Sequence, residues 1–204
     1  EHTKMEKKSP YGRINSKNLL IKSVDYLRNK GQLPATYFVL NRNNCSKFSK
    51  LLHQNLITPE ESALSTKLFN KYLLKYKHTY EKTEQYNEIL KLLSKGIAIH
   101  HSGLIPVLKE AIEMIYAEGL IKVLFATETF AAGVNMPTKT VVFTQMSKFD
   151  GKKRNFNTDE YKQMAGRAGR RGLDTYGSIY HVPMYELLSK QEAKMMMNGK
   201  TSSI

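Results

Sequence analysis

Residues 163–174 read QMAGRAGRRGLD and combine three arginines with three glycines. A guanidinium group stays charged at any physiological pH and can grip a phosphate with two parallel hydrogen bonds. Glycine has no side chain, so it lets a backbone come close to a ligand. The segment therefore predicts a site for a phosphate-bearing ligand. A basic RNA-binding helix without a catalytic role remains the alternative.

This segment continues a predicted helix that begins near Asn157. Asn157 is a favourable N-cap, and Glu160 three residues later completes a variant of the capping box. Helical spacing then predicts one stripe of four residues, which are Gln163, Gly166, Arg167 and Arg170. We expect Gly172 to cap this helix at its end. Arg171 is expected to point about a quarter turn away from the stripe.

A second candidate segment, TETFAAGVNMP at 127–137, follows a predicted strand. Thr127 can offer a hydroxyl and an amide to a phosphate oxygen, and Gly133 permits close approach of the backbone. Asn135 is a short polar residue that tolerates unusual backbone angles. The alternative is a capped turn between a strand and a helix that binds nothing.

The sequence HHSGL at 100–104 also follows a predicted strand. Adjacent strand residues point to opposite faces, so we do not expect His100 and His101 to chelate one metal ion. No cysteine or carboxylate cluster lies near them in the sequence, and we predict no metal site. A turn close to nucleic acid fits better, with Ser102 and Gly103 offering a hydroxyl and amides.

A basic stretch, QMSKFDGKKRNFNTDE at 145–160, follows a third predicted strand and is expected to be a loop. It interleaves Phe149 and Phe156 with four cations, Lys148, Lys152, Lys153 and Arg154. Cations for phosphates and rings for bases suit single-stranded nucleic acid. A solvated surface loop with two anchoring phenylalanines is the alternative.

The composition agrees with a partner that carries many negative charges. The 204 residues have a formal net charge of +14, which predicts attraction to a polyanion such as nucleic acid, although a lysine-rich chain can also be merely soluble. The single cysteine rules out an internal disulfide and suits a reducing compartment. We find neither a signal peptide nor an apolar run long enough for a membrane span. The protein is therefore expected in the nucleus or cytoplasm, not secreted and not in a membrane.

The elements that must position these residues alternate between short apolar strands and helices. Strands are predicted at 35–40, 97–100, 122–126, 140–144 and 177–182, and helices at 16–30 and 105–118. NRNNC at 41–45 is expected to be a polar loop, and 46–93 to be helical with breaks at Pro59 and near Thr83. Continuously apolar strands alternating with helices predict a parallel sheet covered on both faces. Ligands of such sheets bind at the carboxyl ends of the strands.

This organisation predicts three parts of the chain. Residues 1–15 are expected to be a flexible basic lead-in, and residues 16–190 to form one domain. The last part, 191–204, is expected to be a tail or the start of a truncated next element, with a methionine-rich helix after Pro183.

Three segments in order, ATETFAAGVNMP, the FDG-containing loop and EYKQMAGRAGRRGLD, resemble the second RecA-like domain of superfamily 2 helicases. The sequence is most similar to the superkiller-type DExH RNA helicases that feed the RNA exosome, and GIAIHHSGL followed by LKEAIEMIYAEGLIKVLFATETFAAGVNMPTKTVVF carries much of that similarity. It covers roughly Ala35 to Val182. The resemblance implies an α/β fold with a RecA-like parallel sheet and helices on both faces. It is the fold of a P-loop NTPase-like helicase C-terminal domain, lacking the P-loop itself.

The resemblance also implies roles for residues at a nucleotide. The residues that match motif VI, which faces ATP in an interdomain cleft, are Gln163, Arg167 and Arg170. Both arginines would contact the γ-phosphate, and Arg170 is the better candidate for an arginine finger. The residues implied at the cofactor are Gly133 and Asn135, from motif V, and Gly166.

A separate set is implied at the RNA strand. Its members are Arg42 from motif IV, Thr127 and Glu128 at the start of motif V, and His101, Ser102 and Gly103 from the segment near the RNA. Asn41 departs from the family pattern, which usually has Ser-Arg at this point, so its role does not carry over.

Two motifs of a complete motor are absent from the sequence. There is no GxxxxGK[ST] and no DExH box, since DEYK at 159–162 lacks the histidine. The resemblance therefore implies that ATP and Mg²⁺ are shared with a first RecA-like domain, and that this chain does not ligate Mg²⁺. We predict an ATP-dependent RNA helicase in the full-length protein, an inactive isolated domain, and RNA and the exosome or its adaptors as partners. The alternatives are a stand-alone RNA-binding module without ATPase activity and a DNA-unwinding repair helicase.

Overall fold

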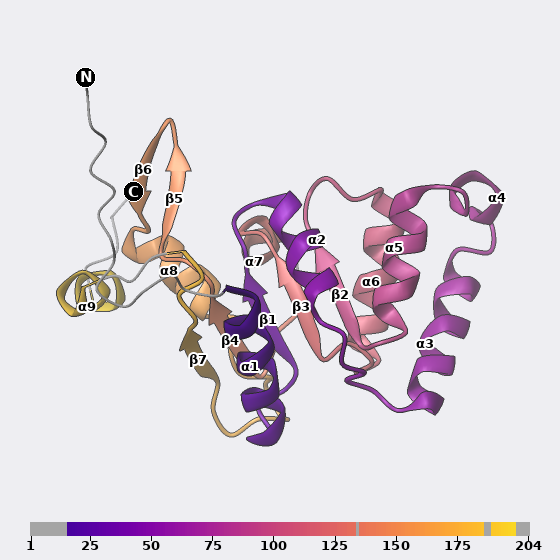
Figure 1. The fold of residues 1–204 in the computed structure, drawn as a ribbon, viewed down its shortest axis with the longest axis horizontal. Coiled ribbons are helices and arrows are strands. Elements are labelled where there is room, and N and C mark those ends of the chain that lie inside the picture. The colour runs from indigo at the N-terminus through magenta and orange to yellow at the C-terminus, as the bar shows by residue number, and fades with distance from the viewer. Residues whose placement is uncertain (1–15, 134, 186–188, 199–204) are drawn as a thin grey trace.

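The computed structural model describes residues 16–133, 135–185 and 189–198. The predicted lead-in, residues 1–15, lies outside the described residues, as do residues 186–188 of the predicted methionine-rich helix and residues 199–204 of the predicted tail. Within the described part, the fold is a central sheet with helices against it (Figure 1).

The central sheet is parallel, as the apolar strands predict. Its five strands lie in the order β2 (Ile97–His100), β3 (Val123–Ala126), β1 (Ala35–Phe38), β4 (Thr140–Phe143) and β7 (Ser178–His181). Every residue of the first four is buried, because helices cover them, whereas β7 at the edge is only partly buried. The paired strands end level with one another, so the segments that follow them meet at one edge, named here the carboxyl edge.

The described residues also form nine helices. They are α1 (Ser16–Asn29), α2 (Arg42–Leu51), α3 (Pro59–Tyr72), α4 (Lys77–Tyr80), α5 (Glu84–Leu93), α6 (Pro106–Ala117), α7 (Thr129–Gly133), α8 (Thr158–Ala165) and α9 (Lys190–Asn198). The crossover from β1 to β2 runs across the sheet in the opposite direction to that from β2 to β3. Right-handed crossovers therefore place α2 and α6 on opposite faces. This confirms the predicted α/β fold with a helix layer on each face; α1 and α2 lie on the near face in Figure 1.

Several helix predictions are confirmed in detail. Of the residues at helical spacing in α1, Leu20, Val24 and Leu27 are buried and Leu19 is partly buried. The predicted break at Pro59 is the first turn of α3, and Thr83 caps the start of α5. Helix α9 begins at Lys190, later than the predicted methionine-rich helix.

The prediction of a polar loop at 41–45 is wrong. Helix α2 begins at Arg42, and Asn41 is its N-cap, with a side-chain oxygen that accepts from the amides of Asn43 and Asn44 at 2.9 and 3.2 Å. Polar residues that cap a helix resemble a loop in sequence. The helix buries Cys45, whose thiol donates to the carbonyl of Val39 at 3.7 Å.

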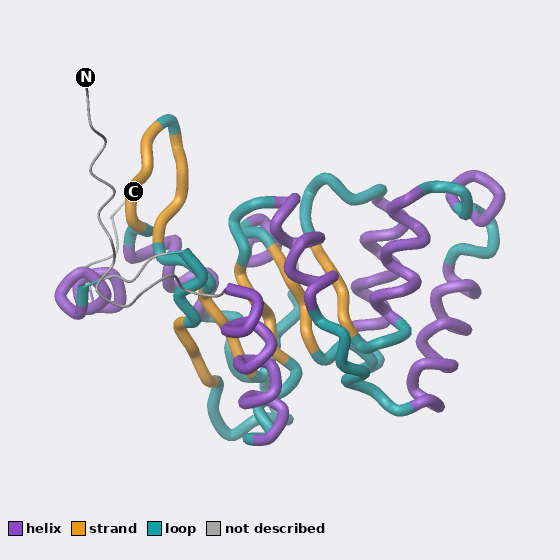
Figure 2. Tube along the Cα trace, viewed as in Figure 1, coloured by secondary structure: helices purple, strands orange, loops and turns teal. Residues whose placement is uncertain are grey.

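The predicted loop after β4 is also wrong, because the chain forms a hairpin there. Strands β5 (Ser147–Asp150) and β6 (Lys152–Asn155) pair antiparallel, and Gly151 between them has a φ of 71°. The hairpin projects beyond the carboxyl edge (Figure 2). Its strands are largely exposed and polar, so they lack the apolar alternation that marks a strand in sequence.

Candidate functional site

At the carboxyl edge, a side-chain hydrogen bond connects the segment after β1 with the polar turn after β2. The Nη2 of Arg42, in the first turn of α2, donates to the Oγ of Ser102 at 2.6 Å. The amide of Gly103 donates to the Nδ1 of His101 at 3.1 Å. A Cβ added at Gly103 would lie 3.2 Å from the Cδ of Arg42, so this glycine lets the arginine cross the turn. The structure thus brings together four of the residues predicted near RNA.

The two adjacent histidines have different partners. His101 is buried, and burial followed by the charge of Arg42 lowers its pKa, so its neutral ring accepts from the amide of Gly103. The Nε2 of His100 lies 2.7 Å from Oε1 of Glu113, and burial lowers the pKa of His100 despite this carboxylate. Among the described residues no group of three or more His, Cys, Asp or Glu could hold a metal ion.

Thr127 and Glu128 follow β3 at the same edge. Thr127 is buried, its Oγ1 lies 2.9 Å from Oγ1 of Thr129, and its amide donates to the carbonyl of His100 at 3.3 Å. Glu128 is exposed. The hydroxyl and amide of Thr127 thus already have partners within the chain, and Glu128 presents its carboxylate to the surface.

A polar groove of about 760 Å³ separates this edge from the hairpin. Its walls come from the ends of β1, β3 and β4, from the hairpin and from Tyr185. Gln145 and Asn44 line it although neither was predicted, and Asn44 donates to the hydroxyl of Tyr185 at 2.7 Å. Gln145 directly follows the strand predicted at 140–144, so the strand-end rule could have found it. Tyr185 carried no such signal.

The hairpin differs from the predicted mixture of cations and rings. Phe149 is 80% exposed, whereas Phe156 is buried with its ring centroid 6.2 Å from that of Phe143. Phe156 therefore belongs to the core. Lys148 and Arg154 form ion pairs with Glu160, so they hold the hairpin in place, and Lys152 is exposed.

The arginines lie at the opposite edge of the sheet, named here the amino edge. The amide of Thr138, just before β4, donates to the carbonyl of Arg167 at 2.9 Å, and the amide of Gly169 donates to the carbonyl of Thr138 at 2.7 Å. The hydroxyl of Thr138 in turn donates to the carbonyl of Pro34, just before β1, at 2.9 Å. The arginine loop, defined as residues 166–174, therefore does not join the strand ends.

The predicted helical stripe is wrong for the same segment. Helix α8 ends at Ala165, and the amide of Gly166 caps it by donating to the carbonyl of Lys162 at 2.8 Å. Gln163 lies on the helix and is exposed, but Arg167 and Arg170 lie beyond it. Gly172 is not the cap, because it lies in the next turn. The capping box of Asn157 and Glu160, in contrast, is confirmed.

A close approach of two backbones requires glycine at Gly169, in the arginine loop, and at Gly177, outside it. A Cβ added at Gly177, just before β7, would lie 2.3 Å from the carbonyl carbon of Ala168. One added at Gly169, whose φ is 92°, would lie 3.1 Å from the nitrogen of Gly177. The predicted need for missing side chains is thus met by packing within the domain.

Two of the three arginines of the loop, Arg167 and Arg170, each have an anchor. Arg167 donates from Nη2 to the carbonyl of Ala131 on α7, which places it beside the segment that leads to Gly133 and Asn135. Arg170 donates from Nε and Nη2 to the two carboxylate oxygens of Asp174 at 2.8 and 2.9 Å. The side chain of Asp174 is 4% exposed, and the hydrogen bonds from Arg170 lower its pKa to about 2. Gly133 and Asn135 are exposed.

The parallel sheet with helices on both faces is an α/β fold of the RecA-like class. The chain belongs to the family described as helicase conserved C-terminal domain, whose profile matches residues 47–172. Within that family it is similar to the superkiller-type DExH RNA helicases, as the sequence motifs predict.

Individual relatives give the same result. The chain is 41% identical to "Superkiller complex protein 2" of Homo sapiens over 180 residues, 87% of the chain and 14% of the relative. It is 40% identical to "ATP-dependent RNA helicase mtr4" of Schizosaccharomyces pombe over 199 residues, 97% of the chain and 18% of the relative. With "Exosome RNA helicase MTR4" of Homo sapiens it shares 36% over 203 residues, 98% of the chain and 19% of the relative. The chain therefore spans less than a fifth of each of these proteins. None of its helices within the described ranges is long and apolar enough to cross a membrane.

Proposed function

We propose that this chain is the C-terminal motor domain of an ATP-dependent RNA helicase that unwinds or remodels RNA in the nucleus or cytoplasm. The observation that carries the proposal is the arginine loop, which displays two anchored guanidinium groups in a chain without a P-loop. The printed names of the relatives include ATP-dependent RNA helicase and exosome RNA helicase, which supports RNA as the substrate and the exosome or its adaptors as partners.

The residues of this chain fit one half of an ATP site. Arg170 holds a carboxylate with two parallel hydrogen bonds, the geometry with which a guanidinium also holds a phosphate. Gly133, Asn135 and Gly166 are exposed. Gly166 directly precedes Arg167, and Gly133 follows Ala131, whose carbonyl accepts from Arg167. Mg²⁺ would be held by a first RecA-like domain and not by this chain, in whose described ranges no group of three or more His, Cys, Asp or Glu could hold a metal ion. ATP would supply the phosphoryl group whose transfer drives the motor.

In this proposal the arginines act by charge. Arg167 and Arg170 would stabilise negative charge that develops on a γ-phosphate, a contribution typical of arginine fingers. Because Arg170 is bound to Asp174, reaching a phosphate requires it to exchange or share that carboxylate. Gln163 is exposed on α8 and would orient polar groups beside Arg167 and Arg170.

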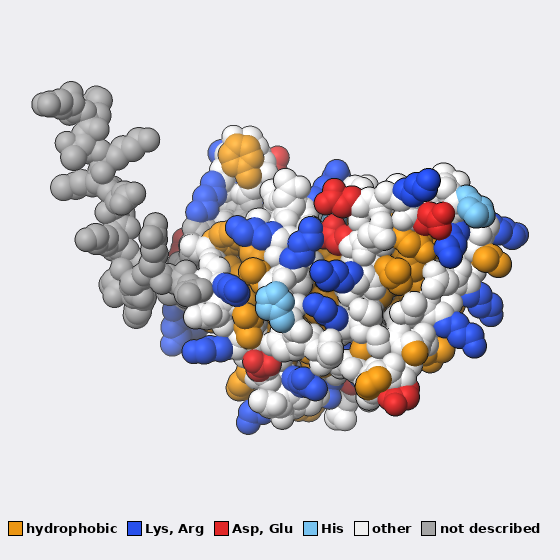
Figure 3. All heavy atoms as spheres, turned by 45° about the vertical axis from the view of Figure 1, so that its right-hand side comes forward, with side chains coloured by type: hydrophobic (Ala, Val, Ile, Leu, Met, Phe, Trp, Pro, Cys, Tyr) orange, Lys and Arg blue, Asp and Glu red, His pale blue; other side chains and the backbone are white. Residues whose placement is uncertain are grey.

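The carboxyl edge would hold the RNA backbone. Arg42, Ser102 and Gly103 are exposed and offer a guanidinium, a hydroxyl and an amide-bearing turn. His101 and Thr127 would position this turn and strand end, with Glu128 at the groove beside them. Lys and Arg side chains are spread over the face that Figure 3 shows, which agrees with electrostatic attraction to a phosphate backbone.

The central test is Arg170→Ala in the full-length protein. We expect ATP turnover to fall about 10³-fold or more, with RNA affinity nearly unchanged. Arg171→Ala is the matched control, because it removes the same charge from the next, exposed residue and should change turnover little. Unchanged turnover for Arg170→Ala would refute the arginine-finger role, and robust turnover by the isolated domain would reveal a complete nucleotide site. Unwinding assays on matched RNA and DNA duplexes test the choice of nucleic acid.

A further inference from the structure

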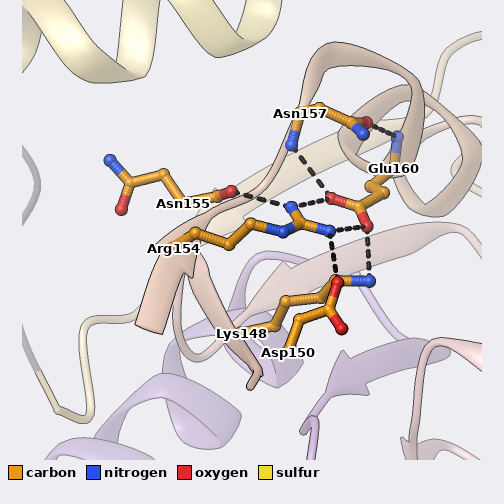
Figure 4. Close-up of polar contacts among 6 residues, drawn as sticks. All are labelled: Lys148, Asp150, Arg154, Asn155, Asn157 and Glu160. Carbon is orange, nitrogen blue, oxygen red and sulfur yellow. Dashed lines mark hydrogen bonds and ion pairs between the residues drawn. The ribbon is translucent and has the colours of Figure 1, made fainter. Parts of the chain in front are cut away.

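One carboxylate, that of Glu160 in the first turn of α8, collects donors from both strands of the hairpin (Figure 4). Arg154 on β6 donates from Nη1 to Oε2 and from Nη2 to Oε1, both at 2.8 Å. The Nζ of Lys148 on β5 lies 2.5 Å from Oε1. A planar bidentate pair fixes orientation as well as distance, so the hairpin is held at a defined angle to α8.

The same carboxylate also begins the helix. Its Oε2 accepts from the amide of Asn157 at 2.9 Å, and the amide of Glu160 donates to the side chain of Asn157 at 2.8 Å. The hydrogen bonds from Arg154 first, and then those from Lys148 and Asn157, lower the pKa of Glu160 to about 2, although partial burial opposes this. Glu160 is therefore charged throughout the physiological range, and the ion pairs persist across it.

Helix α8 connects the two edges of the sheet. It starts beside the hairpin at the carboxyl edge and ends beside the arginine loop at the amino edge, a span of about 12 Å for its eight residues. Tyr161 and Met164 are buried, and the ring of Tyr161 is stacked 4.8 Å from that of Phe143 on β4. The helix is thus packed through these two side chains and lies between the hairpin and the arginine loop.

An isolated two-stranded hairpin is marginally stable in water, so its orientation depends on what holds it. At its base, the amide of Phe156 donates to the carbonyl of Met146 at 3.0 Å, and the ring of Phe156 is buried. Beyond this base, the ion pairs with Glu160 hold both strands. At the far end the hairpin exposes Phe149 and Lys152, a ring and a cation of the kind that contact single-stranded nucleic acid.

We propose that Glu160 is a positioning residue that couples nucleic acid at the hairpin to the arginine loop through α8. This inference takes its two ligands, RNA at the hairpin and ATP at the arginine loop, from the proposed function. Load on the hairpin reaches the first turn of α8 through the Arg154 and Lys148 ion pairs, and the end of α8 leads directly to Arg167. Without the charge of Glu160, the hairpin would move independently of the helix, and strand displacement would follow ATP turnover less closely.

The test is Glu160→Gln in the full-length protein. Glutamine keeps the volume and an oxygen for the amide of Asn157 but removes the charge that holds the two cations. We expect ATP turnover without RNA to stay near the parent value, and the base pairs separated per ATP hydrolysed to fall about fivefold or more, the lower end of usual coupling between sites. Asp150→Asn is the matched control. It removes a carboxylate that is 65% exposed and 3.4 Å from Arg154, and it should leave this ratio unchanged.

A second readout does not require catalysis. Hydrogen exchange is followed at the amide of Gly169, which donates to Thr138 at the amino edge, with and without a single-stranded oligouridylate. RNA should alter this exchange in the parent protein and in Asp150→Asn, but not in Glu160→Gln. An unchanged ratio of base pairs per ATP, or an RNA effect at Gly169 that survives Glu160→Gln, would overturn the proposal.

Two outcomes separate this proposal from others. If Glu160→Gln fails to fold, Glu160→Asp takes its place, because it keeps the charge and draws the carboxylate back from the hairpin. If ATP turnover without RNA and strand separation fall by the same factor in that variant, Glu160 has a purely structural role. That result would also overturn the proposal. A parent protein that hydrolyses no ATP refutes the proposed function, whereas the exchange experiment still decides whether Glu160 couples the two edges.

Discussion

Gly177→Ala is expected to displace the arginine loop, and its cost follows from the structure. The added Cβ would lie 2.3 Å from the carbonyl carbon of Ala168, 2.4 Å from its oxygen and 2.6 Å from the nitrogen of Gly169. An ordinary contact needs about 3.5 Å, so the two backbones must separate by roughly 1 Å. No rotamer can relieve this overlap, because every atom involved belongs to the backbone or is the Cβ itself.

Separation of the backbones would also break the hydrogen bonds that tie the loop to Thr138. Two such bonds contribute about 1 kcal/mol each, and the overlap adds roughly 1–3 kcal/mol. We therefore expect the free energy of unfolding to fall by about 3–5 kcal/mol. At about 2–4 °C per kcal/mol for a domain of this size, Tm should fall by roughly 10 °C. Thermal unfolding followed by circular dichroism measures this shift.

Gly119→Ala is the matched control for Gly177→Ala. Gly119 has a φ of 75°, but a Cβ there would meet nothing within 4 Å. This substitution measures only the strain of placing a side chain at a positive φ, and it should lower the free energy of unfolding by about 1 kcal/mol. If Gly177→Ala lowers Tm no more than Gly119→Ala does, the close approach of the two backbones does not constrain the arginine loop, and the reasoning is refuted.

Two further predictions concern the two edges of the sheet. Asp174 has a pKa of about 2, below its usual 3.8, so its ion pair should stabilise the fold by about 2 kcal/mol above pH 4, and this contribution should disappear as pH falls from 4 to 2. In urea unfolding, Asp174→Asn should have a lower free energy of unfolding than the parent at pH 7, and this difference should disappear near pH 2. A difference that persists at pH 2 would contradict the assignment. Arg42→Ala should weaken RNA binding and reduce the slope of log K against log salt by about 1, whereas Arg28→Ala, at the end of α1, should leave the slope unchanged. Equal slopes for both variants would exclude a phosphate contact at Arg42.

The central sheet and the carboxyl edge could be predicted because their signals are local. Strands such as Val123–Ala126 are buried on both faces and therefore appear as short apolar runs. Once the strands are parallel, Arg42 and Ser102 are expected at the same edge of the sheet, although β3 lies between the strands that they follow. The capping box at Asn157 is equally local, because its two partners are three residues apart.

The arginine loop could not be predicted in this way, because contacts between distant residues decide it. Helical spacing continues through Gly166 and Gly169, and nothing nearby in sequence shows that Gly169 pairs with Thr138 and packs against Gly177. The resemblance implied a role for Arg167 and Arg170, but the sequence did not show that their loop lies at the amino edge. The hairpin was missed for a related reason, since its ion pairs with Glu160 replace the apolar face by which a strand is usually recognised.

The buried thiol on α2 has a practical consequence for following the motor in solution. Burial, with a smaller effect from Glu128, raises the pKa of Cys45 to about 12, and the side chain is fully covered. Maleimide reagents need an accessible thiolate, so the native cysteine should remain unlabelled. A cysteine introduced at Lys152, in the exposed hairpin, would then be the reactive thiol of this chain. A fluorophore attached there could report hairpin movement during single turnovers without any need to remove the native residue.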